Sequence, residues 1–345
     1  MIVTVHTSRI KENFDTVRLA YGKPLIFMCK ANAYGHGMVE AASVIKPSAF
    51  GVATEEEGAR LRPFVSAPIL VTSPRISAIE AIAVNGLIPF VGEENYARAL
   101  IDSHSVKRCH IKVDSGMHRS GFSSPKVCSE IVSRLVANGI TVEGICTHYI
   151  GTDKENVLRQ NAFFDECVRA IRGALFPQDF IPYTHVTFSG APYAARYDRL
   201  RVGLAAYGYE IGRHPVHLFG KAMEVTSEVL NVKRLKVGDS LGYDRVFIAD
   251  RPLSACTVLG GYADGIDRRD VGQNVIVNGK RARIAAVCMD TFEVVSDAVD
   301  LCVEDRVIIL SDETDARYIA ERRGTIPYEV LVGFDTRRAE RKYER

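Results

Sequence analysis

The stretch PLIFMCKANAYGHG (Pro24–Gly37) joins an apolar run to a polar loop, with a lysine at the junction. Apolar residues and one cysteine lead directly into Lys30, and two glycines and a histidine follow within the same stretch. An ammonium group at the end of a buried strand is costly unless it has a partner or a function. Lys30 is therefore the first candidate functional residue.

Similar apolar runs recur along the first two thirds of the chain, and amphipathic helix-like segments separate them. The runs cover residues 24–30, 49–54, 68–73, 87–92, 109–114, 142–149, 185–190 and 200–208. Continuous apolar strands alternating with helices indicate a parallel sheet covered on both faces. This pattern predicts an α/β fold, a (βα)8 TIM-type barrel over residues 1–219. A doubly wound open sheet stays an alternative.

The pattern changes near residue 220. Helical spacing gives way to short alternating segments, which turn signals such as VGD, VNGK and ADG separate. Asn278–Gly279 lies between two β-rich runs and predicts a hairpin turn. Residues 220–345 are therefore predicted to form a mostly β C-terminal domain.

Composition limits the class of protein. The chain has 345 residues, a net charge of +2 and 25% charged residues without a basic or acidic block, so neither nucleic acid nor a membrane is an expected partner. The N-terminus lacks a signal-peptide pattern, and no apolar window is long enough to span a bilayer. The eight cysteines are scattered, which favours reduced thiols and a cytoplasmic protein.

Polar residues gather where the predicted strands end. They are Lys30, Asp114, Arg119, His148, Ser189 and Arg201. In a (βα)8 barrel the chemistry lies at the C-terminal ends of the strands, so these side chains are expected to converge on one mouth. A lysine held there loses hydration and its pKa falls, which makes it a nucleophile able to form a Schiff base with an aldehyde. Gly190, Gly203 and Gly208 can offer backbone amides to a phosphate.

These residues form motifs that resemble the alanine racemase family, whose cofactor is pyridoxal 5'-phosphate. CKANAYGHG resembles the family's cofactor-attachment motif. Further blocks occur in the family's order: KVDSGMHRSGF (112–122), GICTHY (144–149), RVGLAAYG (201–208), GDSLGYDRVF (238–247), GGYADGIDRR (260–269), VCMD (287–290) and IPYEVL (326–331). The resemblance implies a fold-type III barrel plus a β domain, a homodimer with shared active sites and no metal ion.

The resemblance also implies a set of cofactor-binding residues. Lys30 would hold the cofactor covalently, and Arg201 would lie against the pyridine nitrogen. His148 would link Arg201 to a tyrosine of the partner subunit. The positions that match the family's phosphate-binding residues are Tyr34, Ser189, Gly203, Leu204 and Tyr328.

Catalysis would use two bases on opposite faces of the substrate, because racemisation removes an α-proton from one face and returns one to the other. By resemblance these bases are Lys30 and Tyr243, the latter from the partner subunit. Arg119 and the backbone amide of Met289 would bind the substrate carboxylate. Lys112 corresponds to a lysine that the family often carbamylates, and Tyr262 and Asp290 would line the substrate entrance.

The expected partners of these bases make physical sense. A free tyrosine has a pKa near 10, so Tyr243 needs nearby positive charge to act as a base, which Arg201 and His148 could provide. An arginine stays protonated, so Arg201 is a poor proton donor to the ring nitrogen. A ring left unprotonated is a weaker electron sink, which limits side reactions.

Two residues depart from the family pattern. His118 stands where glycine is usual, and Phe188 precedes Ser189 where asparagine is common. Phe188 is expected to alter the surroundings of the phosphate, and His118 to narrow or re-polarise the loop that carries Arg119. Neither change removes a reacting group, but both leave the choice of amino acid open.

The leading hypothesis is a racemase that interconverts L- and D-alanine and supplies D-alanine for cell-wall precursors. A serine or broad-specificity amino-acid racemase is the alternative within the same chemistry. A decarboxylase of related architecture is a further alternative, although such enzymes usually place a carboxylate at the ring nitrogen. A non-catalytic cofactor-binding protein is a fourth reading, and the β domain that contains Tyr243 argues against it.

Overall fold

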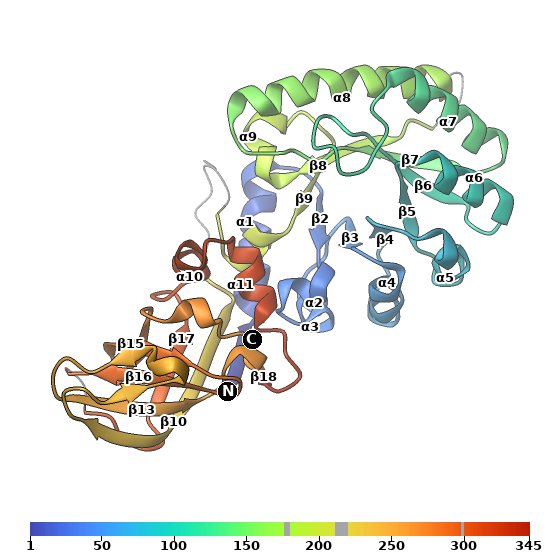
Figure 1. Ribbon diagram of the computed structural model, residues 1–345. Coiled ribbons are helices and arrows are strands. Elements are labelled where there is room, and N and C mark those ends of the chain that lie inside the picture. The colour runs from blue at the N-terminus through green and yellow to red at the C-terminus, as the bar shows by residue number, and fades with distance from the viewer. Residues whose placement is uncertain (176–179, 211–219, 298–299) are drawn as a thin grey trace. The chain divides into compact units, whose positions relative to one another are not determined.

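The computed structural model describes residues 1–175, 180–210, 220–297 and 300–345 (Figure 1). The chain divides into two compact units. A barrel unit contains Lys11–Ala33 and Ala41–Phe219, and a second unit contains Met1–Ile10, Tyr34–Glu40 and Gly220–Arg345. The limits predicted from sequence, 1–219 and 220–345, stay a prediction. No helix among the described residues is long and apolar enough to cross a bilayer.

The barrel unit is built on a closed ring of parallel strands, which confirms the predicted TIM-type barrel (Figure 1). The strands are β2 (Leu25–Met28), β3 (Ala49–Val52), β4 (Ile69–Val71), β5 (Ile88–Val91), β6 (Arg108–Lys112), β7 (Thr141–Cys146), β8 (Tyr183–Thr187) and β9 (Arg199–Val202). β9 pairs with β2 and closes the ring. Each strand overlaps one predicted apolar run, and most of the strand side chains are buried.

Amphipathic helices cover the barrel strands. They are α1 (Thr7–Tyr21), α3 (Met38–Ser43), α4 (Glu55–Leu61), α5 (Ile79–Val84), α6 (Glu94–Ser103), α7 (Pro125–Ala137), α8 (Lys154–Leu175) and α9 (Ala191–Ala194). In α8 the side chains of Val157, Phe164 and Ile171 are buried, as their helical spacing predicts. Helices α4, α6 and α7 begin with a side-chain cap, because Thr54 accepts from Glu57 N, Glu93 from Tyr96 N and Ser124 from Val127 N.

The second unit is a mainly antiparallel sheet, which confirms the predicted β-rich domain. Its strand order is β13-β16-β15-β14-β17-β10-β1-β18, and β10 also pairs with β13, so the sheet curls back on itself. The bounds are β1 (Ile2–His6), β10 (Met223–Leu235), β13 (Leu253–Leu259), β14 (Asn274–Val277), β15 (Lys280–Val287), β16 (Thr291–Ser296), β17 (Arg306–Leu310) and β18 (Glu340–Glu344). β11 (Ser240–Leu241) and β12 (Phe247–Ile248) form a separate pair.

Local sequence explains several connections in the second unit. Asn278 and Gly279 both have positive φ, 52° and 72°, and join β14 to β15 by the predicted two-residue turn. Helix α10 (Ala316–Arg323) begins at the capping residue Asp315 and ends at Gly324, which has a left-handed conformation. α11 (Pro327–Gly333) has a proline in its first turn.

Candidate active site

Cationic side chains converge at the C-terminal ends of the barrel strands, as predicted. Lys30 follows β2, Lys112 ends β6, Arg201 lies in β9, and Arg119 lies in the loop after β6. His148 follows β7 and lies close enough to these four side chains for their charges to act on it. Its pKa is lowered to about 2, first by burial and then by the charges of Arg201, Arg119, Lys112 and Lys30 in that order. The barrel therefore brings these predicted residues into one electropositive mouth.

Lys30 is suited to act as a nucleophile. Its pKa is lowered, first by burial and then by the positive charge of Arg119 and of Arg201, whereas Glu57 opposes the shift. A lowered pKa increases the fraction of neutral amine, which is the form that attacks a carbonyl carbon. The position of Lys30 and its surroundings thus agree with the chemistry expected from the sequence.

The backbone after Lys30 is left-handed, a feature that the sequence did not predict. Ala31, Asn32 and Ala33 have φ/ψ near 50°/50°, and Tyr34 has φ 54°, although none is glycine. A left-handed conformation costs on the order of 1–2 kcal/mol for each residue with a side chain. The rest of the barrel must therefore stabilise this turn.

Glu57 holds the start of the left-handed turn. Its Oε1 accepts a hydrogen bond of 2.7 Å from Ala31 N, and its Oε2 accepts another of 2.7 Å from Ala53 N. One carboxylate thus joins the turn after β2 to the segment after β3. Sequence reasoning missed Glu57, because it stands in the acidic run that begins α4, where acids usually serve only the helix dipole.

We expect Glu57→Gln to lower the free energy of unfolding by about 1–3 kcal/mol, because the amide can accept from only one N–H and its NH2 group faces the other. Thermal and urea unfolding measure this loss. Glu56→Gln removes the same charge from the neighbouring exposed residue and should change stability little. Equal effects of the two substitutions would contradict the role given to Glu57.

Arg201 is held by groups that the sequence did not suggest. Its side chain is 5% exposed, and its Nη1 donates to His185 Nδ1 at 2.8 Å and to the His185 carbonyl at 3.1 Å. Its Nη2 donates to the Thr147 carbonyl. His185 is the first residue of the apolar run 185–190, and that position is the only sequence signal for it. The predicted link from Arg201 to Tyr243 through His148 stays a prediction.

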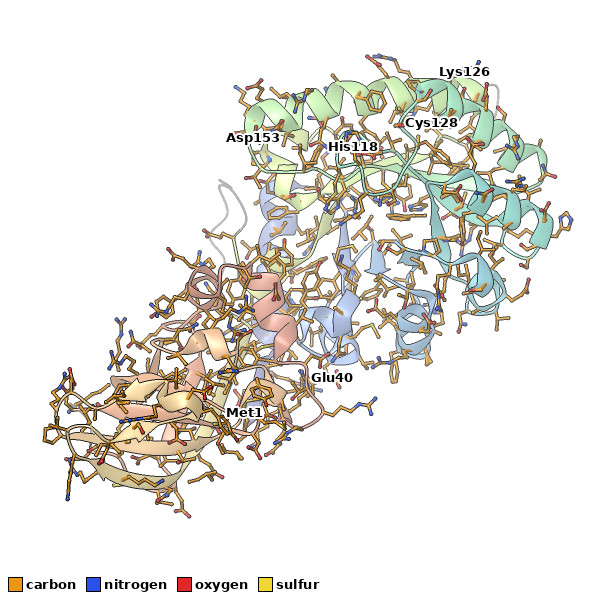
Figure 2. The ribbon with its side chains drawn as sticks, in the orientation of Figure 1. Met1, Glu40, His118, Lys126, Cys128 and Asp153 are labelled. Carbon is orange, nitrogen blue, oxygen red and sulfur yellow. The ribbon has the colours of Figure 1, made fainter. Side chains whose placement is uncertain are left out.

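The loop after β6 carries Arg119 and folds back on its strand. Phe122 N donates to the Lys112 carbonyl at 2.9 Å, and the Asp114 carboxylate accepts from Gly116 N and His118 N at 3.0 Å each. His118, labelled in Figure 2, has φ 55° and is 82% exposed. This conformation explains why glycine suits the position, and His118 adopts it at a cost of about 1–3 kcal/mol.

Lys112 is buried at the end of β6, and its Nζ donates to Ser120 Oγ. Burial lowers its pKa, and Arg119 and Arg201 act in the same direction. Lys112, Arg119 and Ser120 line a cleft of about 300 Å³ with residues that follow β4 and β5. A lowered pKa increases the fraction of neutral amine, which suits the predicted carbamylation; the carbamylation stays a prediction.

The predicted phosphate positions of the barrel follow β8 and β9. Ser189 is half-buried in the short turn Phe188–Gly190, and Gly203 precedes the turn Leu204–Tyr207. Phe188 is 4% exposed, and its ring meets the Tyr21 ring edge-on at 5.6 Å between centroids. The Phe188 side chain, which departs from the family pattern, therefore packs into the apolar interior.

The remaining predicted residues belong to the second unit. The Tyr34 and Tyr328 rings lie 5.7 Å apart between centroids, and burial raises the pKa of Tyr328 to about 12. Tyr243 follows β11, and its side chain is 74% exposed. The structure thus brings Tyr34 and Tyr328 together, and their phosphate role stays a prediction.

Backbone hydrogen bonds join the segments that carry Tyr262, Met289 and Asp290. Gly260 N donates to the Asp290 carbonyl at 2.8 Å, Tyr262 N to Cys288 at 3.0 Å, and Ala263 N to Met289 at 3.0 Å. Any side chain at Gly261 would lie within 2.5 Å of this backbone, so only glycine fits there. The structure therefore places the three predicted residues side by side.

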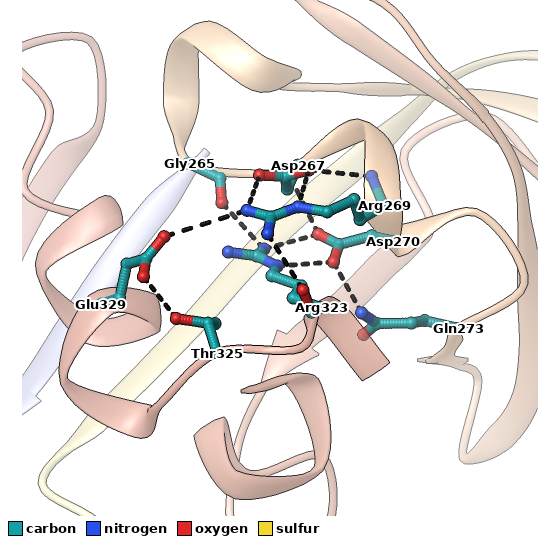
Figure 3. A network of polar contacts seen from close by, with 8 residues as sticks. All are labelled: Gly265, Asp267, Arg269, Asp270, Gln273, Arg323, Thr325 and Glu329. Carbon is teal, nitrogen blue, oxygen red and sulfur yellow. Dashed lines mark hydrogen bonds and ion pairs between the residues drawn. The ribbon is translucent and has the colours of Figure 1, made fainter. Parts of the chain in front are cut away.

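A buried ion pair fixes the loop that follows Tyr262 (Figure 3). Arg323 donates to both carboxylate oxygens of Asp270, at 2.6 and 2.5 Å, and to the Gly265 carbonyl at 3.0 Å. The two side chains are only 6% and 4% exposed. Asp270 also accepts from Gln273 Nε2 at 2.6 Å. The pair links the loop of Tyr262 to the end of α10, shortly before Tyr328.

We expect Arg323→Met to lower the free energy of unfolding by about 3–5 kcal/mol, because it leaves the buried Asp270 carboxylate unpaired. Guanidinium unfolding measures the loss. The double variant Arg323→Met, Asp270→Leu removes both charges and should recover much of it. A double variant as unstable as the single one would show that shape, and not the stranded charge, sets the cost.

Comparison with known proteins gives matches along nearly the whole chain. The family described as alanine racemase, N-terminal domain, matches residues 5–211, and alanine racemase, C-terminal domain, matches residues 222–343. The alanine racemase of Thermodesulfovibrio yellowstonii is 33% identical over 355 residues, which are 97% of this chain and 93% of that protein.

Two solved structures share the architecture. The alanine racemase of Bacillus anthracis with bound L-Ala-P aligns with a TM-score of 0.90 at 27% identity, over 100% of this chain and 95% of the other. That of Bartonella henselae, with covalently bound pyridoxal phosphate, aligns with a TM-score of 0.88 at 24% identity, over 99% of both chains. At 24% identity, the match to the Bartonella henselae structure shows a shared fold and nothing more.

Proposed function

Because the chain belongs to the alanine racemase family, we propose that it interconverts L- and D-alanine with pyridoxal 5'-phosphate as its cofactor. The observation that carries this proposal is Lys30, an amine of lowered pKa at a strand end among Arg119, Arg201 and Lys112. Serine or broad-specificity racemisation and decarboxylation are not favoured by the relatives.

The residues of the barrel mouth fit the cofactor chemically. A neutral lysine suits an aldehyde, and a cationic mouth suits a phosphate and a substrate carboxylate. When bound, the cofactor supplies an electron sink that acidifies the α-proton of the amino acid. We assign its covalent attachment to Lys30, its ring nitrogen to Arg201, and its phosphate to Tyr34, Ser189, Gly203, Leu204 and Tyr328.

The protein itself supplies the proton transfers. Lys30 takes or returns the proton on one face of the substrate carbon, and Tyr243 does so on the other. Arg119 and the Met289 backbone amide orient the substrate carboxylate. Arg201 is a permanent cation and keeps its protons, so it stabilises charge at the ring without donating to it.

A chiral assay tests the function. We expect equilibration of L- and D-alanine by the purified protein with added cofactor, at a rate well above that on L-serine or L-lysine. A clear excess for serine or lysine would contradict the alanine assignment, and released carbon dioxide would indicate decarboxylation. Retained cofactor without any racemisation would favour a binding protein.

The rate at which cofactor-free enzyme takes up the cofactor should rise with pH and level off below the ordinary lysine pKa of about 10.4. The folded protein disfavours protonation of Lys30, so the cofactor can attach at a lower pH than to a free lysine. By the same shift, the free energy of unfolding rises with pH between the lowered pKa of Lys30 and its pKa in the unfolded chain. Stopped-flow absorbance measures the curve.

Arg119→Gln removes one cation that depresses the Lys30 pKa, so its uptake curve should move to higher pH. A curve that coincides with the wild-type one would show that burial alone sets the pKa. Lys126→Gln removes an exposed cation of α7 and serves as the matched control.

We infer that the active enzyme is a homodimer in which Tyr243, Met289 and Tyr262 serve the partner's barrel. Their side chains are 74%, 56% and 48% exposed in the single chain, which is unusual for large residues assigned to catalysis and substrate binding. Sedimentation at assay concentration tests this, and a fully active monomer would contradict it.

We also propose a cytoplasmic location and a role in supplying D-alanine for cell-wall precursors. Six of the eight cysteines are buried and all eight carry free thiols, which suits a reducing compartment. Fractionation of cells that produce the tagged protein tests the location, and D-alanine dependence of a strain lacking the gene tests the role.

A further inference from the structure

A chain of polar side chains crosses the barrel interior and ends at Arg201. Tyr183 Oη lies 3.1 Å from His110 Nε2, His110 Nδ1 lies 2.9 Å from His185 Nε2, and His185 Nδ1 lies 2.8 Å from Arg201 Nη1. Tyr183 begins β8, whereas Arg201 lies near the end of β9. Because the strands are parallel, the chain runs from the N-terminal end of the barrel to its mouth.

The interior is shaped to hold this chain. Both histidines have no exposed surface. A side chain at Gly144 would lie 2.9 Å from the His110 ring, so the glycine leaves room for it. The Phe90 ring stacks on His110 at 5.7 Å between centroids, and the Arg199 guanidinium lies 3.6 Å from the centre of the Tyr183 ring. The Phe90 ring thus helps to fix the His110 ring, and the Arg199 cation helps to fix the Tyr183 ring.

The hydrogen bonds of the chain can have only one direction. Arginine has donors and no acceptor, so His185 Nδ1 must accept. Burial, together with nearby arginines, lowers the pKa of His185 well below its usual value and the pKa of His110 to about 3. Both rings are therefore neutral, and each carries one proton. His185 must donate from Nε2 to His110 Nδ1, and His110 must donate from Nε2 to Tyr183 Oη.

We propose that His110 and Tyr183 are positioning residues that orient Arg201 from the far end of the barrel. His110 accepts from His185 and so holds it in the tautomer that offers a lone pair to Arg201. Tyr183 holds His110 in the same way. The expected effect on catalysis rests on the proposed function, in which Arg201 lies at the cofactor ring. The direction of the hydrogen bonds does not depend on that function.

The direct test is nitrogen NMR of the enzyme labelled at histidine, with and without cofactor. We expect two imidazoles in the Nε2–H tautomer that do not titrate between about pH 6 and about pH 9. In Tyr183→Phe the His110 signals should shift because its N–H loses its acceptor. Protons on Nδ1, or titration in this range, would overturn the proposal whatever the enzyme's reaction is.

A matched pair of variants tests the effect on Arg201. In His110→Asn the side-chain oxygen replaces Nδ1 as the acceptor for His185, whereas His110→Leu has a similar size and no acceptor. We expect kcat to fall about tenfold in the leucine variant and to stay within about threefold of wild type in the asparagine variant. The absorption maximum of the bound cofactor should shift only in the leucine variant.

Equal losses in both His110 variants, with equal drops in Tm, would mean that the ring only fills space and would overturn the positioning role. If the leucine variant does not fold, Tyr183→Phe tests the positioning role. Tyr183 lies at the end of the barrel, and this substitution removes only one hydroxyl group. An unshifted His185 and cofactor spectrum in that variant would also overturn it.

Discussion

Lys30→Ala is expected to abolish the absorbance of covalently bound cofactor and to lower the racemisation rate by about four orders of magnitude or more. The substitution removes both the covalent attachment and one of the two bases, each of which contributes about 10²–10⁴-fold or more. Absorption spectra and the chiral assay measure both losses. Added alkylamines should restore part of the activity, since they supply a neutral amine to the same cavity.

Lys126→Ala is the control for this substitution. Lys126, labelled in Figure 2, lies on α7 with an 84% exposed side chain. Borohydride reduction of the wild type should mark the peptide that contains Lys30. A visible band that persists in Lys30→Ala and is reducible by borohydride would show that another lysine, such as Lys112, carries the cofactor.

Tyr243→Phe is expected to lower racemisation by about 10²–10⁴-fold while the cofactor stays bound. Phenylalanine keeps the ring and removes the only proton-carrying atom. The base on the other face is intact, so the variant should still exchange the α-proton of one enantiomer with solvent deuterium. Mass spectrometry of each enantiomer separately measures this asymmetry.

Tyr318→Phe is the control, because it makes the same change at a half-buried tyrosine of α10 in the second unit. It should leave the racemisation rate unchanged. Wild-type racemisation by Tyr243→Phe would falsify the two-base mechanism. Exchange of both enantiomers at equal rates would also contradict this mechanism, because the base that remains is assigned to one face of the α-carbon only.

Much of the fold could be predicted because it follows from local patterns. The barrel strands are continuously apolar since a covered parallel sheet buries both faces, and the turn at Asn278–Gly279 requires positive φ. The candidate mouth could be predicted too, because a charged residue at the end of an apolar run, such as Lys30, can be recognised from adjacent residues alone.

The supporting residues could not be found in this way. Glu57 resembles any helix-capping acid until its carboxylate is seen to accept from Ala31 and Ala53. His110 and His185 resemble core histidines until they are seen 2.9 Å apart beneath Arg201. Glu57 lies 26 residues from Ala31, and His110 lies 75 residues from His185, so the sequence does not show that these residues are neighbours.

By itself the sequence determined the order of strands and helices, the change to a β domain and the reactive amine, because periodicity and chemical type are properties of adjacent residues. Only the tertiary structure decided the left-handed turn from Ala31 to Tyr34, the strained His118 and the direction of the hydrogen bonds that reach Arg201. These features are fixed by contacts across the closed barrel or by folded loops, which outweigh the local preferences of the residues involved.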